Sequence, residues 1–580
     1  MKKIFPLLAI LLLTVIALFA CSCGDPAPEP QSLEVEYTLE QVGESQTVDI
    51  TWSADVLLTK LEVTVSHGSQ VVDKQTFEGY NLSDRSVSIE AYYGRHTVSL
   101  KAYADGYYSE KTEELVLSAD EYVIAPISGS MPQLYFTLYM DEITKEHTIP
   151  AFVWLTRPGS WNWEKLPENV YAMPNVDISE VLTHDNFSPM VESTDAYIEE
   201  LYSINPNSKF NLYINDFNAY LYLRLLVANG IPEDNYYVTL LSDGGASNSS
   251  FNAVFNIDEE GFDADPVYAE MVTKLDGLYD EVKDKGTYYY GDEFSVSTTE
   301  FNSYAYVCAK EKDNVEWWLP RPRGGVLCST DAEFIDTVLN IDTVKSPHEN
   351  REDNVIIERN FANPLTNLNE EETASLKALY NFSDDMFAAA EEQGKKAMMI
   401  LGSWVTEEPD FENYVKLVKA YYGDEFVYYY KGHPNTPTAL YPEKQEQLDR
   451  LGLIDVESSI NAELILFFYP DIYMCGYTSS TFTSVFSEEM ACALFNVSLD
   501  KAYADEGYNA YRHLIGFYSY RIIPTEPSDY SELCTNITHS YFVLEFNRDD
   551  KPADIAIFDA NDETLTYYNL VDGEYVKANI

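Results

Sequence analysis

The pattern of hydrophobic and polar positions divides the chain into two parts. Between residues 33 and 125, short runs alternate apolar and polar residues, as at residues 48–52, 60–65, 87–91 and 96–103, and turn residues separate several of them. An alternation with period two predicts strands with one buried face, and several short strands in succession are typical of an immunoglobulin-like β-sandwich. We therefore predict such a sandwich over residues 33–127, acting as a spacer or as a contact surface for glycans or partners.

From residue 131 onward, strand-like and helix-like segments alternate. Residues 133–140 form an apolar run that we interpret as a strand, followed by a helix at 195–203, a strand at 209–214, a helix at 218–229 and a strand at 236–241. The pattern restarts with an apolar run at 396–404. Alternation of this kind predicts largely parallel sheets with helices on both faces. We place two Rossmann-like α/β domains at residues 131–390 and 391–580, with a cleft between them.

Two runs in the second of these domains end in residues that suit ligand binding. Residues 423–434 are rich in tyrosine and stop at Gly432-His433-Pro434, where the proline biases His433 toward an extended backbone at a strand end. The run at 471–476 is followed by hydroxyl residues at 478–481, which suit an anion site at a helix start. An acid or base at one strand end and a phosphate site at another are typical of a sugar-nucleotide enzyme, although burial or capping explains each signal alone.

Three further side chains could carry chemistry. Asp243 follows the strand at 236–241 and precedes two glycines, so it is either a turn former or a general base beside a site with room for substrate. Trp404 follows the strand that begins at residue 396, where it either packs in the core or stacks on a sugar. Glu463 falls in the first turn of a predicted helix, where the helix dipole favours a carboxylate, and could hold the hydroxyls of a ribose.

Charge excludes one large class of partner. The 580 residues include 37 basic and 96 acidic side chains, which gives a net charge of -59. A charge of this sign excludes binding to nucleic acid or to an anionic membrane surface through general electrostatics, so any phosphate site needs local cations. The seven cysteines show no metal-finger spacing, and we expect buried thiols or a Cys308–Cys328 disulfide and no structural zinc.

The N-terminus predicts export and a lipid anchor. Two lysines precede an apolar run at residues 4–20, which is typical of a signal peptide, and the sequence Leu-Phe-Ala-Cys at 18–21 resembles the lipobox of bacterial lipoproteins. By that resemblance Cys21 is the lipidated first residue of the mature chain, and residues 21–32 form a proline-rich tether. The alternatives are an ordinary signal peptide or an anchor helix. We expect the protein in the cell envelope, attached to a bacterial membrane outside the cytoplasm.

Several of these segments, in this order, resemble the bacterial sialyltransferases of glycosyltransferase family 80. The resemblance is carried by residues 240–244, by Gly402-Ser403-Trp404, by residues 430–434, by Glu463 and by Thr478-Ser479-Ser480. It implies a GT-B fold, CMP-sialic acid as donor and a galactose-containing acceptor, with no cofactor and no metal. Some members of this family also carry an immunoglobulin-like domain before the catalytic part.

The resemblance also implies roles for single residues. Asp243 is the expected general base and His433 the expected general acid. Donor contacts are expected from Lys431, Gly432, Pro434, Glu463, Ser479, Ser480 and Thr144, and acceptor contacts from Trp404 and Asn218. The sequence departs from the family at Ser242 and Gly245, and Asn218 stands where relatives have a histidine that touches the acceptor, so acceptor choice is less defined than the donor.

Two other functions stay open from the sequence. One is a GT-B transferase that uses a different sugar nucleotide. The other is a surface lipoprotein that binds glycans without catalysis, which the tether, the 46 tyrosines and the cytoplasmic synthesis of CMP-sugars all favour. The oligomeric state is open as well.

Overall fold

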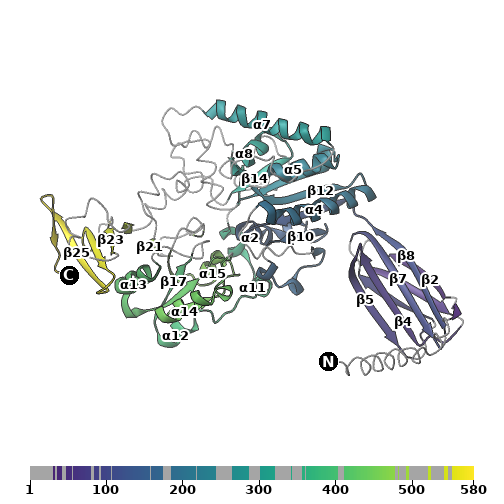
Figure 1. Cartoon of the computed structure of the whole chain (residues 1–580), viewed down its shortest axis with the longest axis horizontal. Coiled ribbons are helices and arrows are strands. Elements are labelled where there is room, and N and C mark those ends of the chain that lie inside the picture. The colour runs from purple at the N-terminus through teal and green to yellow at the C-terminus, as the bar shows by residue number, and fades with distance from the viewer. Residues whose placement is uncertain are drawn as a thin grey trace, which may run out of the picture. The chain divides into compact units, whose positions relative to one another are not determined.

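The computed structural model (Figure 1) shows a chain of β-strands followed by alternating strands and helices. It describes residues 31–32, 35–41, 47–54, 56–79, 82, 84–90, 93–105, 107–156, 158–173, 184–216, 219–242, 264–285, 301–319, 341–342, 356–359, 361–402, 411–434, 436–476, 481, 492–495, 520–523, 541–546 and 552–580. Chain contacts divide the protein into two compact units, of which the first extends to Ala119 and includes Ser203–Asn205.

The first unit contains two β-sheets. A five-stranded sheet has the order β1-β8-β7-β4-β5, and a three-stranded sheet has the order β2-β3-β6. All pairs are antiparallel except β1 with β8. The strands are β1 (Gln31–Ser32), β2 (Val35–Gln41), β3 (Thr47–Ala54), β4 (Lys60–His67), β5 (Gln70–Glu78), β6 (Asp84–Glu90), β7 (Gly94–Ala104) and β8 (Tyr107–Leu117). The predicted strands are confirmed, and the immunoglobulin-like topology stays a prediction.

The boundary between sandwich and α/β region differs from the predicted one. The sequence analysis assigned residues 121–127 to the sandwich, but they form β9 (Glu121–Ile127) inside the eight-stranded sheet of the second unit. Six of the seven residues of β9 are buried, as expected for a parallel strand covered on both faces. The second unit therefore begins at Asp120, and the predicted boundary at residues 127–131 is wrong.

The first α/β sheet is parallel throughout, with the order β11-β10-β9-β12-β13-β14-β16-β15. The strands after β9 are β10 (Ala151–Leu155), β11 (Val170–Ala172), β12 (Lys209–Asn215), β13 (Tyr236–Leu241), β14 (Val315–Leu319), β15 (Ile341–Asp342) and β16 (Ile356–Glu358). The helices are α2 (Ser130–Leu138), α3 (Met140–Ile143), α4 (His184–Ile204), α5 (Ala219–Ala228), α7 (Ala264–Lys285) and α8 (Phe301–Glu311). The predicted parallel sheet is confirmed.

The apolar run at residues 133–140 is helical, which corrects the predicted strand. It forms α2 and the start of α3, and α2 packs Met131, Leu134 and Tyr135 on one face of the sheet. A short run that is apolar at most positions has no clear period that separates a strand from a buried helix. Pro132 fits here because the first turn of a helix tolerates a residue without an N–H group.

The second α/β sheet begins with parallel strands, in the order β19-β18-β17-β20-β21-β22. These are β17 (Lys396–Leu401), β18 (Phe426–Lys431), β19 (Ile454–Val456), β20 (Tyr473–Gly476), β21 (Cys492–Phe495) and β22 (Tyr520–Ile523). Helices α10 (Ala362–Asn367) and α11 (Glu370–Leu379) still pack in the core of the first sheet. The helices of the second part are α12 (Ala388–Gln393), α13 (Phe411–Tyr422), α14 (Pro442–Leu451) and α15 (Ala462–Phe468). Local signals set several boundaries: α14 starts on Pro442, and left-handed Gly394 and Gly452 end α12 and α14.

The C-terminal end of the same sheet is antiparallel, which the prediction of a Rossmann-like domain over residues 391–580 did not include. Strands β22 to β26 pair in sequence as a meander. The added strands are β23 (Tyr541–Phe546), β24 (Ile555–Asp559), β25 (Thr564–Val571) and β26 (Glu574–Lys577), at the yellow end of the chain in Figure 1.

Candidate functional site

The chain order reverses at one place in each parallel sheet. In the first sheet the chain runs from β9 outward through β10 to β11 and returns at β12, so β9 and β12 are neighbours. In the second sheet it runs from β17 through β18 to β19 and returns at β20, which lies beside β17. Ligands of open α/β sheets bind beyond the carboxyl ends of the strands at such reversals. The two reversals therefore define the candidate site.

Three strands of the second sheet end at the same level. Leu401, the last residue of β17, pairs with Lys431 at the end of β18 and with Gly476 at the end of β20. The N–H of Gly402 donates to the carbonyl oxygen of Lys431 at 2.9 Å, which keeps β17 and β18 together up to their ends. In the sequence, Trp404, His433 and the hydroxyl residues at 478–481 come within a few residues after these three strand ends.

Gly476 marks the reversal of the second sheet because a side chain does not fit there. Its φ angle is +138°, and a Cβ atom would lie 2.2 Å from the carbonyl oxygen of Leu401 and 2.6 Å from the Leu401 nitrogen. Glycine alone permits this conformation and this approach of two backbones. The close contact between β17 and β20 thus depends on a glycine at the end of β20.

The corner after β18 holds the backbone of His433 in place. The carbonyl oxygen of His433 accepts a hydrogen bond from the N–H of Thr436 at 2.9 Å. Thr438 is buried and donates its hydroxyl to the Asp455 carboxylate of β19 at 3.1 Å. The corner is therefore tied to the neighbouring strand at its far end, and the half-buried imidazole of His433 extends from a constrained turn, as the sequence predicted.

Lys431 and Glu463 form the charged centre of this part. Lys431 is 3% exposed, and its ammonium donates to the carbonyl oxygens of Ser458 at 2.9 Å and Gly432 at 3.2 Å. Burial raises the pKa of Glu463, while a backbone hydrogen bond, the Thr481 hydroxyl and the positive charge of Lys431 oppose that shift. The structure thus brings together two predicted donor residues, and α15 places Glu463 in its first turn as expected.

Lys431 holds the segment that leads into α15. Its bond to Ser458 connects the end of β18 to a segment only a few residues before Asn461, the N-cap of α15. Burial also raises the pKa of the nearby Asp455, and the Thr438 hydroxyl, followed by the charge of Lys431, counteracts this effect. The buried ammonium of Lys431 stabilises the charged form of both carboxylates. Without it, each carboxylate would become protonated more readily.

The reversal of the first sheet is fastened by an asparagine. The N–H of Ser128, directly after β9, donates to Asn215 Oδ1 at 2.9 Å, and Asn215 Nδ2 donates to the carbonyl oxygen of Ser128. Two strands further along, the N–H of Ser242 donates to the carbonyl oxygen of Trp318 at 3.2 Å. This bond extends the pairing of β13 with β14 to the residue immediately before Asp243.

The two reversals lie close to one another through α15. Asn461 Nδ2 donates to the carbonyl oxygen of Ser130 at 2.8 Å, and Ser130 is the first residue of α2, just after β9. Leu464 of α15 belongs to the same core cluster as Met131 and Leu134 of α2. Because Lys431 bonds to Ser458 and Asn461 bonds to Ser130, a short run of contacts joins the carboxyl ends of β18 and β9.

Six of the predicted site residues lie outside the described residues: Cys21, Asn218, Asp243, Trp404, Ser479 and Ser480. Their roles stay predictions. What the structure places is the chain that precedes four of these positions, at the ends of β13, β17 and β20.

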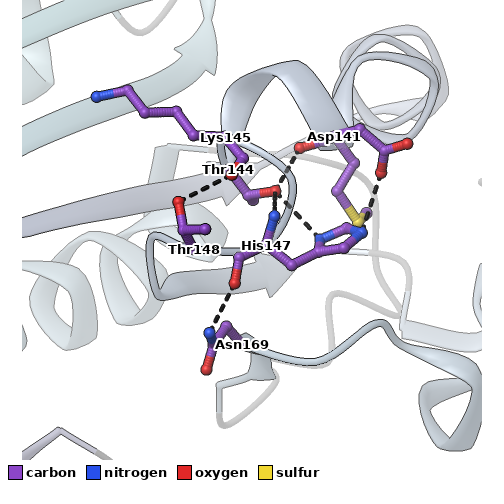
Figure 2. A network of polar contacts seen from close by, with 7 residues as sticks. Asp141, Thr144, Lys145, His147, Thr148 and Asn169 are labelled. Atoms are coloured by element: carbon purple, nitrogen blue, oxygen red, sulfur yellow. Dashed lines mark hydrogen bonds and ion pairs between the residues drawn. The ribbon is translucent and has the colours of Figure 1, made fainter. Parts of the chain in front are cut away.

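Thr144 lies away from this site, which contradicts its predicted contact with the donor. Its buried hydroxyl donates to the carbonyl oxygen of Met140 at 2.7 Å and lies 3.1 Å from His147 Nδ1, as Figure 2 shows. The next residue, Lys145, bonds to Glu121 at the amino end of β9. Thr144 thus caps the C-terminal end of α3 at the opposite edge of the sheet, where its hydroxyl stabilises the turn.

Sequence reasoning missed Ser128 and Asn461. The segment Ser128-Gly129-Ser130 follows a buried strand and opens a helix, which is the signal of a phosphate- or anion-binding turn in α/β proteins. The signal was hidden because residues 121–127 were assigned to the sandwich. Asn461 is an N-cap whose amide bonds across to α2 and not to its own helix, which no local pattern indicates.

The described residues hold no group of three or more His, Cys, Asp or Glu side chains placed to bind a metal ion. No helix in the described part of the chain is both long and apolar enough to cross a membrane. Cys475 is buried in β20, where burial raises the pKa of its thiol to about 12, and Cys328 lies outside the described residues.

Comparisons find similarity in structure and not in sequence. No family model and no curated protein matches the chain. Three solved structures align with it: a sialyltransferase from Photobacterium damsela (12% identity, 83% of this chain and 96% of that one, TM-score 0.46), a galactoside α-2,3-sialyltransferase from Photobacterium phosphoreum (12%, 69% and 96%, TM-score 0.47), and a 2,6-sialyltransferase from a Vibrionaceae Photobacterium species in complex with CMP and lactose (14%, 84% and 92%, TM-score 0.45). At this level of likeness, the named activities are those of the three enzymes and are not transferred to this chain.

Proposed function

We propose that the protein is an inverting sialyltransferase, which moves sialic acid from CMP-sialic acid to a galactose-containing acceptor. The observation that carries the proposal is the common level of Leu401, Lys431 and Gly476 at the carboxyl edge of the second sheet. Three strands end side by side there, and Trp404, His433 and Ser479-Ser480 each follow one of these ends within a few residues in the sequence. One sugar-nucleotide site needs such an arrangement of residues that are far apart in sequence.

In the proposed reaction, the acceptor hydroxyl oxygen attacks the anomeric carbon of sialic acid as the bond to the CMP phosphate oxygen breaks. Asp243 takes the proton of the acceptor hydroxyl, and His433 gives a proton to the departing phosphate. Attack from the face opposite the leaving group inverts the anomeric centre, through an oxocarbenium-like transition state. Each proton transfer contributes on the order of 10² to 10⁴ in rate.

The donor is held by the residues around Lys431 in this proposal. The Glu463 carboxylate accepts hydrogen bonds from the ribose hydroxyls, and Ser479 and Ser480 donate to the phosphate. Gly432 and Pro434 shape the turn beneath the nucleotide, while Trp404 and Asn218 contact the acceptor. Lys431 adds positive charge next to the phosphate. Its hydrogen bond to Ser458 also holds the segment before α15, and with it Glu463, beside the end of β18. Preorganised charge of this kind stabilises a leaving phosphate.

The test is incubation of the protein with CMP-sialic acid and lactose, followed by analysis of sialyllactose and free CMP. We expect both products in equal amounts. Release of CMP from a different CMP-sugar, or of a nucleoside diphosphate from its sugar nucleotide, with no reaction of CMP-sialic acid would identify another GT-B transferase. Lactose binding without any nucleotide release would identify a glycan-binding protein and contradict the proposal.

The location of the enzyme is part of the proposal. Cys21 carries the lipid that holds it to a bacterial membrane outside the cytoplasm. We expect Cys21→Ser to move the protein from the membrane fraction to the soluble fraction without loss of sialyl transfer. A protein that stays soluble with Cys21 intact would contradict the anchor while leaving the activity untouched.

A further inference from the structure

The outer face of the five-stranded sheet in the first unit carries six aromatic and charged side chains in two neighbouring rows. Along β7 the side chains alternate between the core and this face, so that Val98 and Leu100 are buried and Lys101 is partly exposed. Strands β4, β7 and β8 are adjacent in the sheet (Figure 1), and their register sets the two rows. The first row is Lys60, Tyr103 and Tyr108, and the second row is Glu62, Lys101 and Glu110. We call these six residues the tyrosine patch.

Two rings form the aromatic part of the tyrosine patch. The ring centroids of Tyr103 and Tyr108 lie 5.3 Å apart, and the planes of the rings are inclined by 53°. Both residues are half-buried, so that part of each is open to solvent. The face of an aromatic ring carries partial negative charge and attracts the polarised C–H groups of a ligand. The pair therefore offers a contact surface that is apolar and still selective.

A carboxylate and an ammonium accompany the first ring. Glu62 accepts a hydrogen bond from the Tyr103 hydroxyl at 3.4 Å and pairs with the Lys60 ammonium at 2.6 Å. That ammonium also lies 5.4 Å from the centroid of the Tyr103 ring. The hydrogen bond from Lys60 lowers the pKa of Glu62, so the carboxylate is ionised at neutral pH and offers acceptor atoms beside the ring.

The second ring has the same surroundings. Glu110 accepts a hydrogen bond from the Tyr108 hydroxyl and pairs with the Lys101 ammonium at 3.0 Å. The hydrogen bonds from Tyr108 and then from Lys101 lower the pKa of Glu110. The side chains of Lys101 and Glu110 are 37% and 42% exposed, so a ligand can reach both. The tyrosine patch thus repeats one combination of ring, carboxylate and ammonium at the surface.

Stability alone does not account for this arrangement. Exposed ion pairs contribute little to the free energy of unfolding, because solvent screens them and both long side chains lose freedom. A set of aromatic and charged groups that is held in place on a regular sheet is what a binding site requires, since association then orders few side chains.

The chemistry of the tyrosine patch defines the class of ligand. The rings match the C–H face of a sugar, the carboxylates accept hydrogen bonds from hydroxyl groups, and the ammonium groups donate to hydroxyl and ring oxygens. Two lysines and two glutamates cancel in charge, and the whole chain carries a net charge of -59. Because this field repels anions, the ligand that fits is polyhydroxylated and neutral.

We infer that the tyrosine patch is a binding site for neutral glycans. It belongs to the first unit and shares no residue with the site around Lys431, so it goes beyond the proposed function and does not depend on it. A glycan chain bound there stays attached to the same molecule that carries the α/β sheets. Such attachment raises the effective concentration of the remaining sugars of that chain around the protein.

Calorimetry on the full chain, without nucleotide, tests the inference. The probes are the β-1,4-linked tetramers of galactose, glucose, mannose and N-acetylglucosamine, and the acidic tetramer of galacturonic acid. We expect at least one neutral tetramer to bind with a Kd of about 1 mM or below, and the acidic tetramer to bind at least tenfold more weakly. Tyr103→Ala and Tyr108→Ala each remove a ring and should weaken the neutral tetramer about fivefold or more. Tyr103→Phe keeps the ring and should stay within about threefold of the wild type.

Glu110→Gln and Glu114→Gln form a matched pair of variants. Both remove one charge from an exposed ion pair between β7 and β8, but Glu114 pairs with Arg95 and lies outside the tyrosine patch. We expect only Glu110→Gln to weaken the neutral tetramer, and circular dichroism establishes that every variant is folded.

Two results would overturn the inference. The first is a wild-type protein that binds no neutral tetramer, or that binds the acidic tetramer more tightly. The second is an equal affinity for the neutral tetramer in wild type, Tyr103→Ala and Tyr108→Ala. Transfer of sialic acid from CMP-sialic acid to lactose, measured on the same variants, should be unchanged and tests the proposed function separately.

Discussion

Lys431 shows how a single side chain can serve both structure and site. Its ammonium is buried, and it is satisfied by backbone carbonyls of the corner after β18 and of the segment before α15. A buried charge is tolerated when it is hydrogen-bonded and lies near opposite charge, as Lys431 does near Glu463 and Asp455. The sequence predicted a phosphate contact here, and the structure adds a positioning role.

His433 carries the first residue-scale prediction. In His433→Ala the departing phosphate loses its proton donor, so we expect turnover with CMP-sialic acid to fall on the order of 10²- to 10⁴-fold while CMP binding changes little. In Ser479→Ala we expect nucleotide binding to weaken first. Steady-state kinetics and calorimetry measure both effects. His147→Ala, in the α3 cap of Figure 2, is a control that should keep its turnover. Full transfer activity in His433→Ala and Ser479→Ala would refute the assignment.

Glu463 carries a prediction about pH. Because burial raises its pKa, the folded protein holds a proton on this group up to a higher pH than the unfolded chain does. The stability that this proton contributes is fully present below the unfolded pKa and is lost as the pH rises through the folded pKa. Glu463→Gln, which stays neutral, should therefore exceed the wild type in unfolding temperature near neutral pH, with a smaller difference at a pH of about 4.

Thermal unfolding of Glu463→Gln and wild type over this pH range measures the effect. The exposed Glu457, six residues earlier, provides the control: Glu457→Gln should shift the unfolding temperature by a small and constant amount. A constant difference for Glu463→Gln as well would show that its ionisation is the same in the folded and unfolded protein.

At the scale of elements, the two α/β sheets share one arrangement: strands run outward from the first strand, and the chain then returns to its other side. The contact between β17 and β20 at that return depends on Gly476, and the contact between β9 and β12 depends on Asn215. The helices α2 and α15 begin beside these places and are bonded to each other. Strand order thus decides where the chemistry lies.

Gly476→Ala tests this dependence. A Cβ atom at 2.2 Å from Leu401 O forces the backbones apart, so we expect the free energy of unfolding to fall by about 3 kcal/mol or more and CMP affinity to fall with it. Gly394→Ala is the matched control, because its φ angle is also positive but nothing lies within 4 Å of the added carbon. It should cost about 1 kcal/mol and leave CMP affinity unchanged. Urea unfolding measures the free energy of unfolding of each variant, and calorimetry measures its CMP affinity. Equal losses of stability in Gly476→Ala and Gly394→Ala would refute the argument.

At the scale of the whole molecule, the acidic net charge makes the location of the few positive groups decisive for binding an anionic donor. A net charge of -59 repels an anionic donor in general, so binding depends on groups that cancel this field locally. Lys431 and the start of α2 are such groups, and both lie at the carboxyl ends of the parallel strands.

The division into two units yields the last prediction. A chain that begins at Asp120 keeps both parallel sheets and their cores, and a domain with its own core folds alone. We expect it to bind CMP and to transfer sialic acid to lactose at a rate within about threefold of the full chain. Circular dichroism establishes that it is folded. A folded but inactive shortened chain would show that the first unit contributes to the site.

The extent of what could be predicted varies along the chain for a physical reason. The strand at 426–431 and its corner at His433 are local features, since an apolar run and a Gly-x-Pro break act within a few residues. The first strand of the α/β region was misassigned because residues 121–127 alternate too little to show which sheet they join. Thr144 was predicted at the wrong edge of the sheet because the run before it is a helix and not a strand. The helix returns the chain to the amino ends of the strands, where Lys145 bonds to Glu121.

The amino-acid order alone was sufficient for the alternation of strands and helices, the tyrosine-rich strand before His433 and the acidic balance, because these depend on neighbours in sequence. The order of strands in each sheet, the closeness of Gly476 to Leu401 and the meeting of Asn461 with Ser130 emerged only in the folded chain. These contacts join residues up to 331 positions apart, and pairing over such distances is selected by packing of the complete core and by no local pattern.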